Sequence, residues 1–179
     1  MIHNLLDPPD GHTLAAVLQH ELERADGLER GLSLAFIDID GFRQFNLAHG
    51  RDRGNQVLEA IASMLTRVRG CPAAGWIGGD AFAVVIADVS ASEAAQAMGR
   101  ASAVIRDAAR IKGVCREEIA VSVGGITTYR RCTIRGLIRA AHDQLMTAKR
   151  AGGNRVEWTV HFPPTTASLS SRPAIFHDD

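Results

Sequence analysis

The stretch at residues 76–86 constrains the fold more than any other part of the chain. It reads Trp-Ile-Gly-Gly-Asp-Ala-Phe-Ala-Val-Val-Ile, so apolar residues stand on both sides of a Gly-Gly-Asp tip. Glycine accepts positive φ at little steric cost, which suits a tight turn between two strands. The sequence therefore predicts a β-hairpin. Gly78 and Gly79 at its tip let a ligand phosphate or base come close to the backbone, and Asp80 supplies the charge.

A second acidic position follows an apolar run at residues 32–37. The run ends in the letters DIDGF at residues 38–42, and a carboxylate at the end of a buried strand is held on a rigid scaffold. If this strand lies beside the hairpin, Asp38 and Asp80 can share a divalent cation, because Mg²⁺ takes one or two protein carboxylates together with substrate phosphates. For either residue alone the alternative is structural, with Asp38 capping a turn and Asp80 sitting in a hairpin.

Size and composition restrict the remaining function classes. The chain has 179 residues, 46% of them hydrophobic, with 20 basic and 20 acidic residues. This fits one domain with a continuous core and does not indicate a general nucleic-acid or membrane surface. No run is long enough to span a bilayer, residues 1–11 lack the features of a signal peptide, and the three cysteines have no C-x-x-C spacing. We therefore expect a soluble, cytoplasmic protein with reduced thiols and no nucleic-acid or membrane partner.

Hydrophobic periodicity predicts alternating helices and strands along the rest of the chain. Helices are expected from about residue 13, within residues 42–49, over residues 57–68, after a capping box at Ser90 and Glu93, and over residues 134–148. Strands are expected at residues 32–37, in the hairpin, at 119–126 and at 155–160. The pattern is typical of an α/β sandwich, a mixed sheet covered by helices. We expect a short lead at residues 1–12, one domain at 13–160 and a Pro-, Ser- and Thr-rich tail at 161–179.

Several motifs in this order resemble those of the GGDEF (diguanylate cyclase) domain family. They are D-x-D-x-F-R-x-x-N at residues 38–46, then Gly50, Gly54 and Leu58, then G-G-D-x-F at 78–82, and A-K-R-A-G-G-N-R at 148–155. The match runs from about residue 5 to about residue 158. The resemblance implies the palm-like sandwich of nucleotide cyclases, with a signature hairpin, in a bacterial signalling protein. It also implies a reaction that condenses two GTP into cyclic di-GMP between two domains that face each other.

The resemblance assigns the candidate residues to two tasks, holding a metal and holding a nucleotide. The implied ligands of Mg²⁺ or Mn²⁺ are Asp38, the Ile39 carbonyl and Asp80, and Asp80 also helps to deprotonate the attacking 3′-hydroxyl. The implied nucleotide-binding positions are Gly78 and Gly79 at the point of close approach, Asn46 and Asn55 at the base, and Arg43 and Lys149 at the triphosphate. For Arg43 and Lys149 the alternative is solvated charge on a helix face.

The departures from the family pattern cluster at this site. Ala81 replaces the Glu of the signature, Gly153 replaces an Arg of the closing motif, Leu47 replaces an Asp, and Trp76 replaces an Arg before the hairpin. Loss of a carboxylate beside the metal removes on the order of several kcal/mol of transition-state stabilisation. The family's inhibitory R-x-x-D is reduced to Arg69, because Pro72 has no carboxylate. Capture of the product at that position is therefore not expected.

Asn55 bears on the choice of base. The family's Asp at this position accepts from two guanine donors, whereas an Asn accepts once and points its amide donors at the second, a mismatch of about 1–3 kcal/mol. The same amide matches an edge with one donor and one acceptor, such as that of adenine. The sequence therefore leaves the base preference open.

These observations favour a degenerate GGDEF domain that binds GTP or another purine nucleoside triphosphate with Mg²⁺, has weak or no cyclic dinucleotide synthesis, and is regulatory in cyclic di-GMP signalling. Asp38, Asp80, Asn46 and Lys149 support one alternative, an active diguanylate cyclase or a cyclase with altered base preference. A protein-interaction scaffold without nucleotide is the other. Since residues 1–12 leave no room for a sensor domain, we expect regulation by the tail or by a separate sensor or signalling protein. The implied reaction between two domains adds a homodimer to the expected partners.

Overall fold

The computed structural model describes residues 14–25, 31–111, 119–129 and 132–161. In this part of the chain the helices are α1 (Leu14–Ala25), α2 (Phe42–His49), α3 (Arg51–Leu65), α4 (Ala91–Ile111) and α5 (Ile134–Arg150). The strands are β1 (Gly31–Ile39), β2 (Ala73–Gly78), β3 (Ala81–Val89), β4 (Val121–Thr128) and β5 (Val156–His161). The predicted lead and the predicted tail from residue 162 onward lie outside this part. Among the described helices, none has the length and apolar character needed to cross a membrane.

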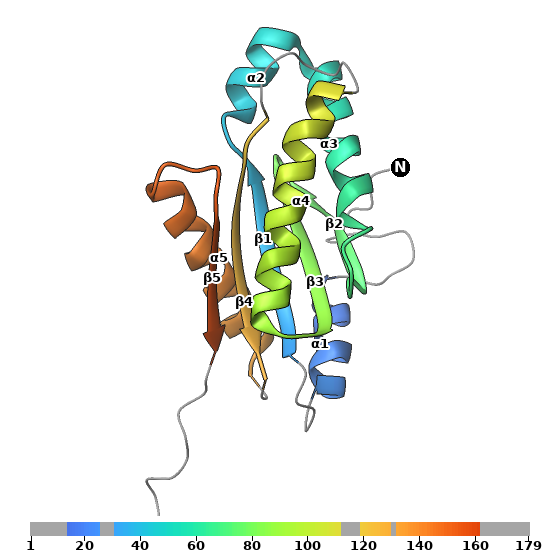
Figure 1. The fold of residues 1–179 in the computed structure, drawn as a ribbon, viewed down its shortest axis with the longest axis vertical. Coiled ribbons are helices and arrows are strands. Elements are labelled where there is room, and N and C mark those ends of the chain that lie inside the picture. Colours follow the sequence, from blue (N-terminus) through green and yellow to red (C-terminus); the bar gives the residue numbers. More distant parts are fainter. Residues whose placement is uncertain (1–13, 26–30, 112–118, 130–131, 162–179) are drawn as a thin grey trace, which may run out of the picture.

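The strands form one mixed sheet in the order β2-β3-β1-β4-β5 (Figure 1). β1 runs antiparallel to both β3 and β4, β2 runs antiparallel to β3, and β5 is parallel to β4. The central strand is therefore β1, which is hydrogen-bonded on both sides. The predicted α/β sandwich with a mixed sheet and a hairpin is confirmed.

Helices cover both faces of the sheet and enclose two apolar cores. α2, α3 and α4 pack on one face, where their residues share a cluster with Ile37 of β1, and α1 and α5 pack on the other face with Phe36. Neighbouring strand residues point to opposite faces, so each face receives every second residue. Strands covered on both sides are largely apolar, which explains why β1 and β3 stand out in the sequence, whereas β4 buries Ser122, Thr127 and Thr128 as well.

Local signals predict the elements well and their ends less well. The capping box forms as predicted: Ser90 N donates to the Glu93 carboxylate at 2.8 Å, and Glu93 N donates to Ser90 Oγ at 3.2 Å. The hairpin strands extend beyond the predicted residues 76–86 at both ends. The sequence predicts that α3 continues to Val68, but it ends at Leu65, because Val68 N donates to the Leu65 carbonyl in a tighter i→i−3 turn.

Two glycines in β4 allow its neighbours to come close. A Cβ at Gly124 would lie 1.9 Å from the backbone nitrogen of Leu145, so α5 packs directly on the backbone of the strand. A Cβ at Gly125 would lie 2.1 Å from the ring of Trp158, which covers that position from β5. The close packing at Gly124 fixes α5, whose last turn carries Lys149.

Candidate functional site

The turn between β2 and β3 is short and open. Gly78 pairs with Ala81, so Gly79 and Asp80 alone form the turn, and Gly79 has a φ of 59°, which favours glycine. A Cβ at Gly78 or Gly79 would meet nothing within 4 Å. Trp76 Nε1 donates to the Gly79 carbonyl at 3.0 Å and holds the turn. The turn backbone is therefore held in place by Trp76, with open space beside Gly78 and Gly79.

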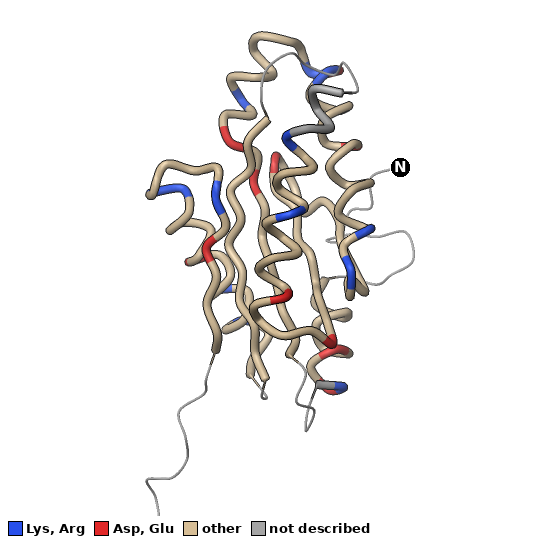
Figure 2. Tube along the Cα trace, in the orientation of Figure 1, with Lys and Arg blue, Asp and Glu red and all other residues tan. Residues whose placement is uncertain are grey.

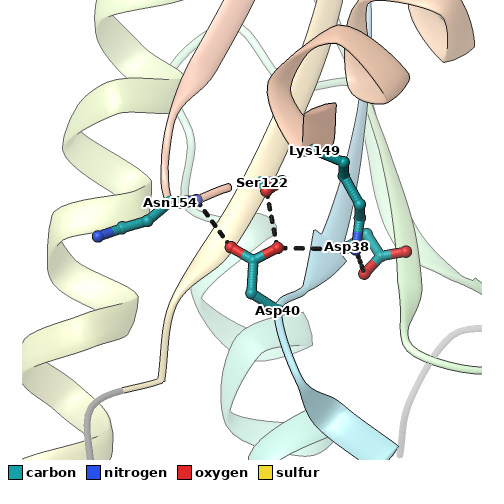
Figure 3. Close-up of polar contacts among 5 residues, drawn as sticks. All are labelled: Asp38, Asp40, Ser122, Lys149 and Asn154. Atoms are coloured by element: carbon teal, nitrogen blue, oxygen red, sulfur yellow. Dashed lines mark hydrogen bonds and ion pairs between the residues drawn. The ribbon is translucent and has the colours of Figure 1, made fainter. Parts of the chain in front are cut away.

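Asp38 lies beside this turn, at the end of β1. It pairs with Ala81 of β3 on one side and with Ser122 of β4 on the other. The amide of the next residue, Ile39, donates to the Asp80 carbonyl at 3.3 Å. Lys149 Nζ donates to Asp38 Oδ1 (Figure 3), although the two residues are 111 positions apart. In Figure 2 acidic positions gather at this end of the sheet, where β1 continues toward α2.

The Asp38 carboxyl is in a mixed electrostatic environment. Its side chain is 19% exposed, and burial is the main cause that raises its pKa above the usual value. The hydrogen bond from Lys149 opposes this change, and the charges of Asp80 and Asp40 raise the pKa further. An added cation beside Asp38 would relieve this repulsion between carboxylates.

Asp40 organises the closing loop next to the same lysine. Ser122 Oγ donates to Asp40 Oδ1 at 2.7 Å, and the backbone amide of Asn154 donates to Oδ2 at 2.8 Å (Figure 3). Lys149 Nζ lies 3.6 Å from Asp40 Oδ1. The sequence motifs assign no role to Asp40, yet the D-x-D spacing contains a signal. Asp40 follows directly after the end of β1, two positions beyond Asp38, and Lys149 approaches both carboxylates.

A pocket of about 760 Å³ opens between α2, α3 and the β2–β3 turn. Its lining combines charged, amide and apolar groups: Phe42, Arg43, Asn46, Leu47, Arg51, Asn55, Leu58, Trp76, Gly79 and Asp80. The structure thus brings together five of the predicted site residues, namely Arg43, Asn46, Asn55, Gly79 and Asp80. The predicted residues Asp38, Ile39, Gly78 and Lys149 are not in this lining. Asp38 and Ile39 adjoin it at Asp80, Gly78 precedes Gly79, and Lys149 is linked to it through Asp38.

Two features of the pocket go beyond what the sequence predicts. Arg51, the first residue of α3, adds a second guanidinium to the lining beside Arg43. Gly54 makes room for Asn46, because a Cβ there would lie 1.9 Å from Asn46 Oδ1. That oxygen is buried without a hydrogen-bond partner among the described residues. The glycine four residues into α3 is the signal that could have indicated this packing.

The donor set at the turn fits Mg²⁺ or Mn²⁺. Asp38 and Asp80 are close enough for the Asp80 charge to raise the pKa of Asp38, and Mg²⁺ is commonly held by one or two carboxylates with phosphate oxygens and water completing the shell. Among the described residues no group of three or more His, Cys, Asp or Glu side chains forms a metal cage. A cation here would therefore depend on a bound phosphate for its remaining ligands.

The family described as "Diguanylate cyclase, GGDEF domain" matches residues 12–155. The chain belongs to the GGDEF family. Among similar curated proteins are the diguanylate cyclase DosC of Escherichia coli, 28% identical over 152 residues, and the probable diguanylate cyclase DgcC of the same species, 30% identical over 143 residues. These alignments cover 80% and 79% of this chain but only 32% and 38% of the relatives. The chain thus spans about a third of the length of these proteins.

Solved GGDEF structures confirm the fold. The GGDEF domain of DgcB from Caulobacter crescentus, in complex with c-di-GMP, is 28% identical with a TM-score of 0.66, covering 80% of this chain and 89% of that one. The active GGEEF domain of a diguanylate cyclase from Vibrio cholerae is 27% identical with a TM-score of 0.69, covering 81% and 93%. The predicted membership of the GGDEF family and the sandwich fold are both supported by these likenesses.

Two residues that depart from the GGDEF signature lie next to the carboxylates. Ala81 is directly opposite Asp38 in the β1–β3 pair, where side chains share a face at about 4.5–5.5 Å between Cβ atoms. A glutamate there would bring a further carboxylate to Asp38 and Lys149. Gly153 has a φ of 73°, and a Cβ on it would lie 3.0 Å from Asp40 Oδ2. The closing loop therefore packs against Asp40 at the point where the GGDEF family has an arginine.

Leu47 and Pro72, two further departures from the family pattern, lie in two different pockets. Leu47 is 79% exposed at the rim of the pocket described above. Arg69 and Pro72 line a different pocket, of about 850 Å³, at the other end of β2, where Ala87 N donates to the Gly70 carbonyl at 2.8 Å. Burial raises the pKa of the neighbouring Cys71 thiol to about 11, so it stays protonated at neutral pH. Arg69, the predicted remnant of an inhibitory motif, thus lies away from the pocket between α2, α3 and the β2–β3 turn.

Proposed function

We propose that this GGDEF domain binds a purine nucleoside triphosphate together with Mg²⁺ or Mn²⁺, has weak or no cyclic dinucleotide synthesis, and serves a regulatory role in cyclic di-GMP signalling. The observation that supports this proposal is the pocket between α2, α3 and the β2–β3 turn. It offers two amides and an indole at one side of a turn whose other side carries Asp38 and Lys149. A base and a charged phosphate chain need these two environments next to each other.

In this proposal different residues bind the base and the phosphates. Asn46 and Asn55 face the base, while Arg43, Arg51 and Lys149 supply positive charge for the phosphates. A bound Mg²⁺ would neutralise phosphate charge between Asp38 and Asp80. Lys149 now neutralises part of the charge of Asp38, so it is positioned to move to a phosphate when the cation enters.

The weak synthesis follows from what the site lacks. With Ala81 opposite Asp38, the charge that spreads over the phosphates during transfer meets one carboxylate fewer for holding cations. Gly153 provides no guanidinium for the triphosphate. Asn55 costs guanine about 1–3 kcal/mol relative to a base edge that offers a donor and an acceptor. Binding needs fewer of these contacts than the chemical step does, because only the transition state uses all of them.

The first test separates binding from synthesis. The purified protein is incubated with Mg²⁺ or Mn²⁺ and an equimolar mixture of GTP and ATP, and the products are read by mass spectrometry, while calorimetry measures the binding of each nucleotide. We expect binding that disappears in Asp80→Ala and with a chelator, and little or no cyclic dinucleotide. Product well above the Asp80→Ala control would support the active cyclase instead. No binding of any nucleotide to folded protein would support the scaffold.

A second experiment restores the family's glutamate at Ala81. Ala81→Glu restores a carboxylate directly opposite Asp38 and is expected to strengthen metal-dependent nucleotide binding. If it also raises synthesis strongly, the missing glutamate limits this domain. If synthesis stays absent, the way in which two copies of the domain associate is the next factor to test. Sedimentation of the nucleotide-bound protein measures whether it forms a dimer.

Regulation by a separate protein is part of the same proposal. The diguanylate cyclase SiaD of Pseudomonas aeruginosa, 26% identical over 82% of this chain with a TM-score of 0.68, has been solved in complex with its activator SiaC. This likeness supports a partner protein for the present chain. A homodimer is supported by the family reaction, in which two domains each hold one nucleotide.

A further inference from the structure

Trp76 is the aromatic residue of the nucleotide pocket that departs from the family pattern. It lies in β2 opposite Phe82 and is half-buried, packing against the core on the α3 side of the sheet. The same side chain lines the pocket together with Asn46 and Asn55. One part of the indole is therefore supported by the core, while another part is available to a ligand.

The polar edge of this indole is already used. Trp76 Nε1 donates to the Gly79 carbonyl at 3.0 Å, and an indole has no second donor and no acceptor. What Trp76 can offer to a ligand is therefore the hydrocarbon surface of its ring. Because the hydrogen bond ties the ring to the turn, a ligand meets this surface already oriented.

We propose that Trp76 provides the surface on which the base of the bound nucleotide stacks, so that this pocket selects purines over pyrimidines more strongly than it selects guanine over adenine. The inference rests on the proposed nucleotide binding and specifies how the base is held. Every base can stack on an aromatic ring, but the two fused rings of a purine make more dispersion contacts with the indole than the single ring of a pyrimidine does. Asn55 carries amide donors and an acceptor, so its amide can meet either purine edge, in contrast to a carboxylate, which only accepts. Asn46 offers a ligand its amide donors, because its Oδ1 is buried.

The charges around the pocket suit a ligand of this kind. Arg43 and Arg51 border it and Asp80 lies at its end, so a negatively charged phosphate chain is favoured near the arginines. The apolar part of the lining comes from Phe42, Leu47, Leu58 and Trp76. Of these, Leu47 is highly exposed, which gives the base a second apolar neighbour at the rim.

Two matched variants isolate stacking from the hydrogen bond. Trp76→Phe and Trp76→Leu both lose the Nε1 donor to Gly79, but only Trp76→Leu loses the aromatic face. We expect the dissociation constant for Mg-GTP and for Mg-ATP, measured by calorimetry, to rise roughly 5- to 150-fold in Trp76→Leu and much less in Trp76→Phe. Circular dichroism and thermal unfolding check that both variants fold.

The outcomes distinguish this inference from the proposed function. If wild-type protein binds nucleotide and Trp76→Leu binds it equally well, stacking is overturned and nucleotide binding stands. If Trp76→Phe and Trp76→Leu lose affinity equally, the indole acts through its hydrogen bond to the turn, and stacking is again overturned. If the wild-type protein binds no nucleotide, the proposed function and the inference both fail.

A fluorescence measurement tests the contact directly. In Trp158→Phe, Trp76 is the remaining tryptophan of the chain, and Trp158 lies away from the pocket, donating Nε1 to Thr127 Oγ1 at 2.9 Å. We expect Mg-GTP and Mg-ATP to quench Trp76 strongly and Mg-UTP to quench it weakly. Mg-tripolyphosphate, which has no base, should leave the emission unchanged. An equal response to GTP and tripolyphosphate would overturn stacking.

Discussion

At the residue scale, Lys149 acts as an internal counter-ion. It hydrogen-bonds Asp38 and lies 3.6 Å from Asp40, and so partly offsets the repulsion between carboxylates at the end of β1. The offset is incomplete, because burial and the charges of Asp80 and Asp40 still raise the pKa of Asp38 overall. The ionised Asp38 therefore costs the folded protein some stability in exchange for a charge that a ligand can use.

The pH dependence of Asp38→Asn tests this balance. A carboxyl whose pKa is raised by folding stabilises the folded state at low pH, where it is protonated, and this contribution is lost as the pH rises through the raised pKa. Asn resembles the neutral form, so we expect Asp38→Asn to unfold at a higher temperature than wild type at pH 7. The advantage should shrink as the pH falls to about 3.5, below the reference pKa of Asp.

Thermal unfolding of both proteins between pH 3.5 and 7, without divalent cations, measures the difference. A variant less stable than wild type at pH 7 would show that the hydrogen bond to Lys149 outweighs the cost of burial. In the presence of Mg²⁺ and nucleotide the order should reverse, since only wild type gains stability from binding.

Gly153 gives a second prediction at this scale. Restoring the family's arginine there forces an L residue into positive φ and brings its Cβ to 3.0 Å from Asp40. We expect Gly153→Arg to lower the free energy of unfolding by about 1–2 kcal/mol. Gly153→Asn is the matched control, because Asn tolerates this backbone region better and should cost less. Urea denaturation measures both, and an arginine variant as stable as wild type would contradict the argument.

At the element scale, the helices are placed by how closely they approach the sheet. A Cβ at Gly124 would collide with the backbone of Leu145, and backbone cannot rotate away as a side chain can. α5 and its Lys149 therefore sit at a distance from β4 that only glycine permits. Gly99, by contrast, is exposed near the middle of α4, and a Cβ added to it would meet nothing within 4 Å.

The same substitution at these two glycines should have opposite signs. We expect Gly124→Ala to destabilise the fold by about 1–3 kcal/mol or more, since α5 must shift to admit the methyl group. Gly99→Ala should stabilise it by about 0.5–1 kcal/mol, because alanine restricts the unfolded chain and favours the helix. Chemical denaturation measures both, and a neutral Gly124→Ala would show that α5 is not fixed at this contact.

The elements could be predicted from sequence because their signals are local. Apolar strands, the glycine turn and the Ser90–Glu93 capping box all lie within a few residues of the structure they specify. The contacts of the site are not local: Asp40 meets Asn154, and Lys149 meets Asp38, across most of the chain. The motifs predict a set of site residues, and only the fold shows that Arg51 and Leu58 line the pocket with some of them.

At the scale of the whole molecule, the two pockets lie at opposite ends of β2. One collects the asparagines, Trp76 and Asp80 beside the hairpin turn, and the other collects Arg69 and Pro72 near the far end of β3. The six residues of β2 lie between them. Substitutions in one pocket should therefore have little effect on ligand affinity in the other.

Arg69→Ala tests this separation. We expect its affinity for Mg-GTP to stay within about twofold of wild type, as for distant sites that do not share partners, while Asp80→Ala loses binding. Calorimetry on the wild-type protein also measures its affinity for cyclic di-GMP. We expect this ligand to bind weakly or not at all, because Pro72 offers no carboxylate. A large effect of Arg69→Ala on Mg-GTP would mean that the two ends of β2 are coupled.

The central position of β1 has a consequence for how the molecule opens. Its backbone is paired from Leu32 to Asp38 with β3 and from Leu32 to Ile39 with β4, and helices cover both faces. In hydrogen-exchange experiments we expect the amide protons of this stretch to exchange only when nearly the whole domain unfolds. Since Asp38 is still paired on both sides, with Ala81 and Ser122, we expect its carboxylate to keep its place through the fluctuations that loosen the outer strands.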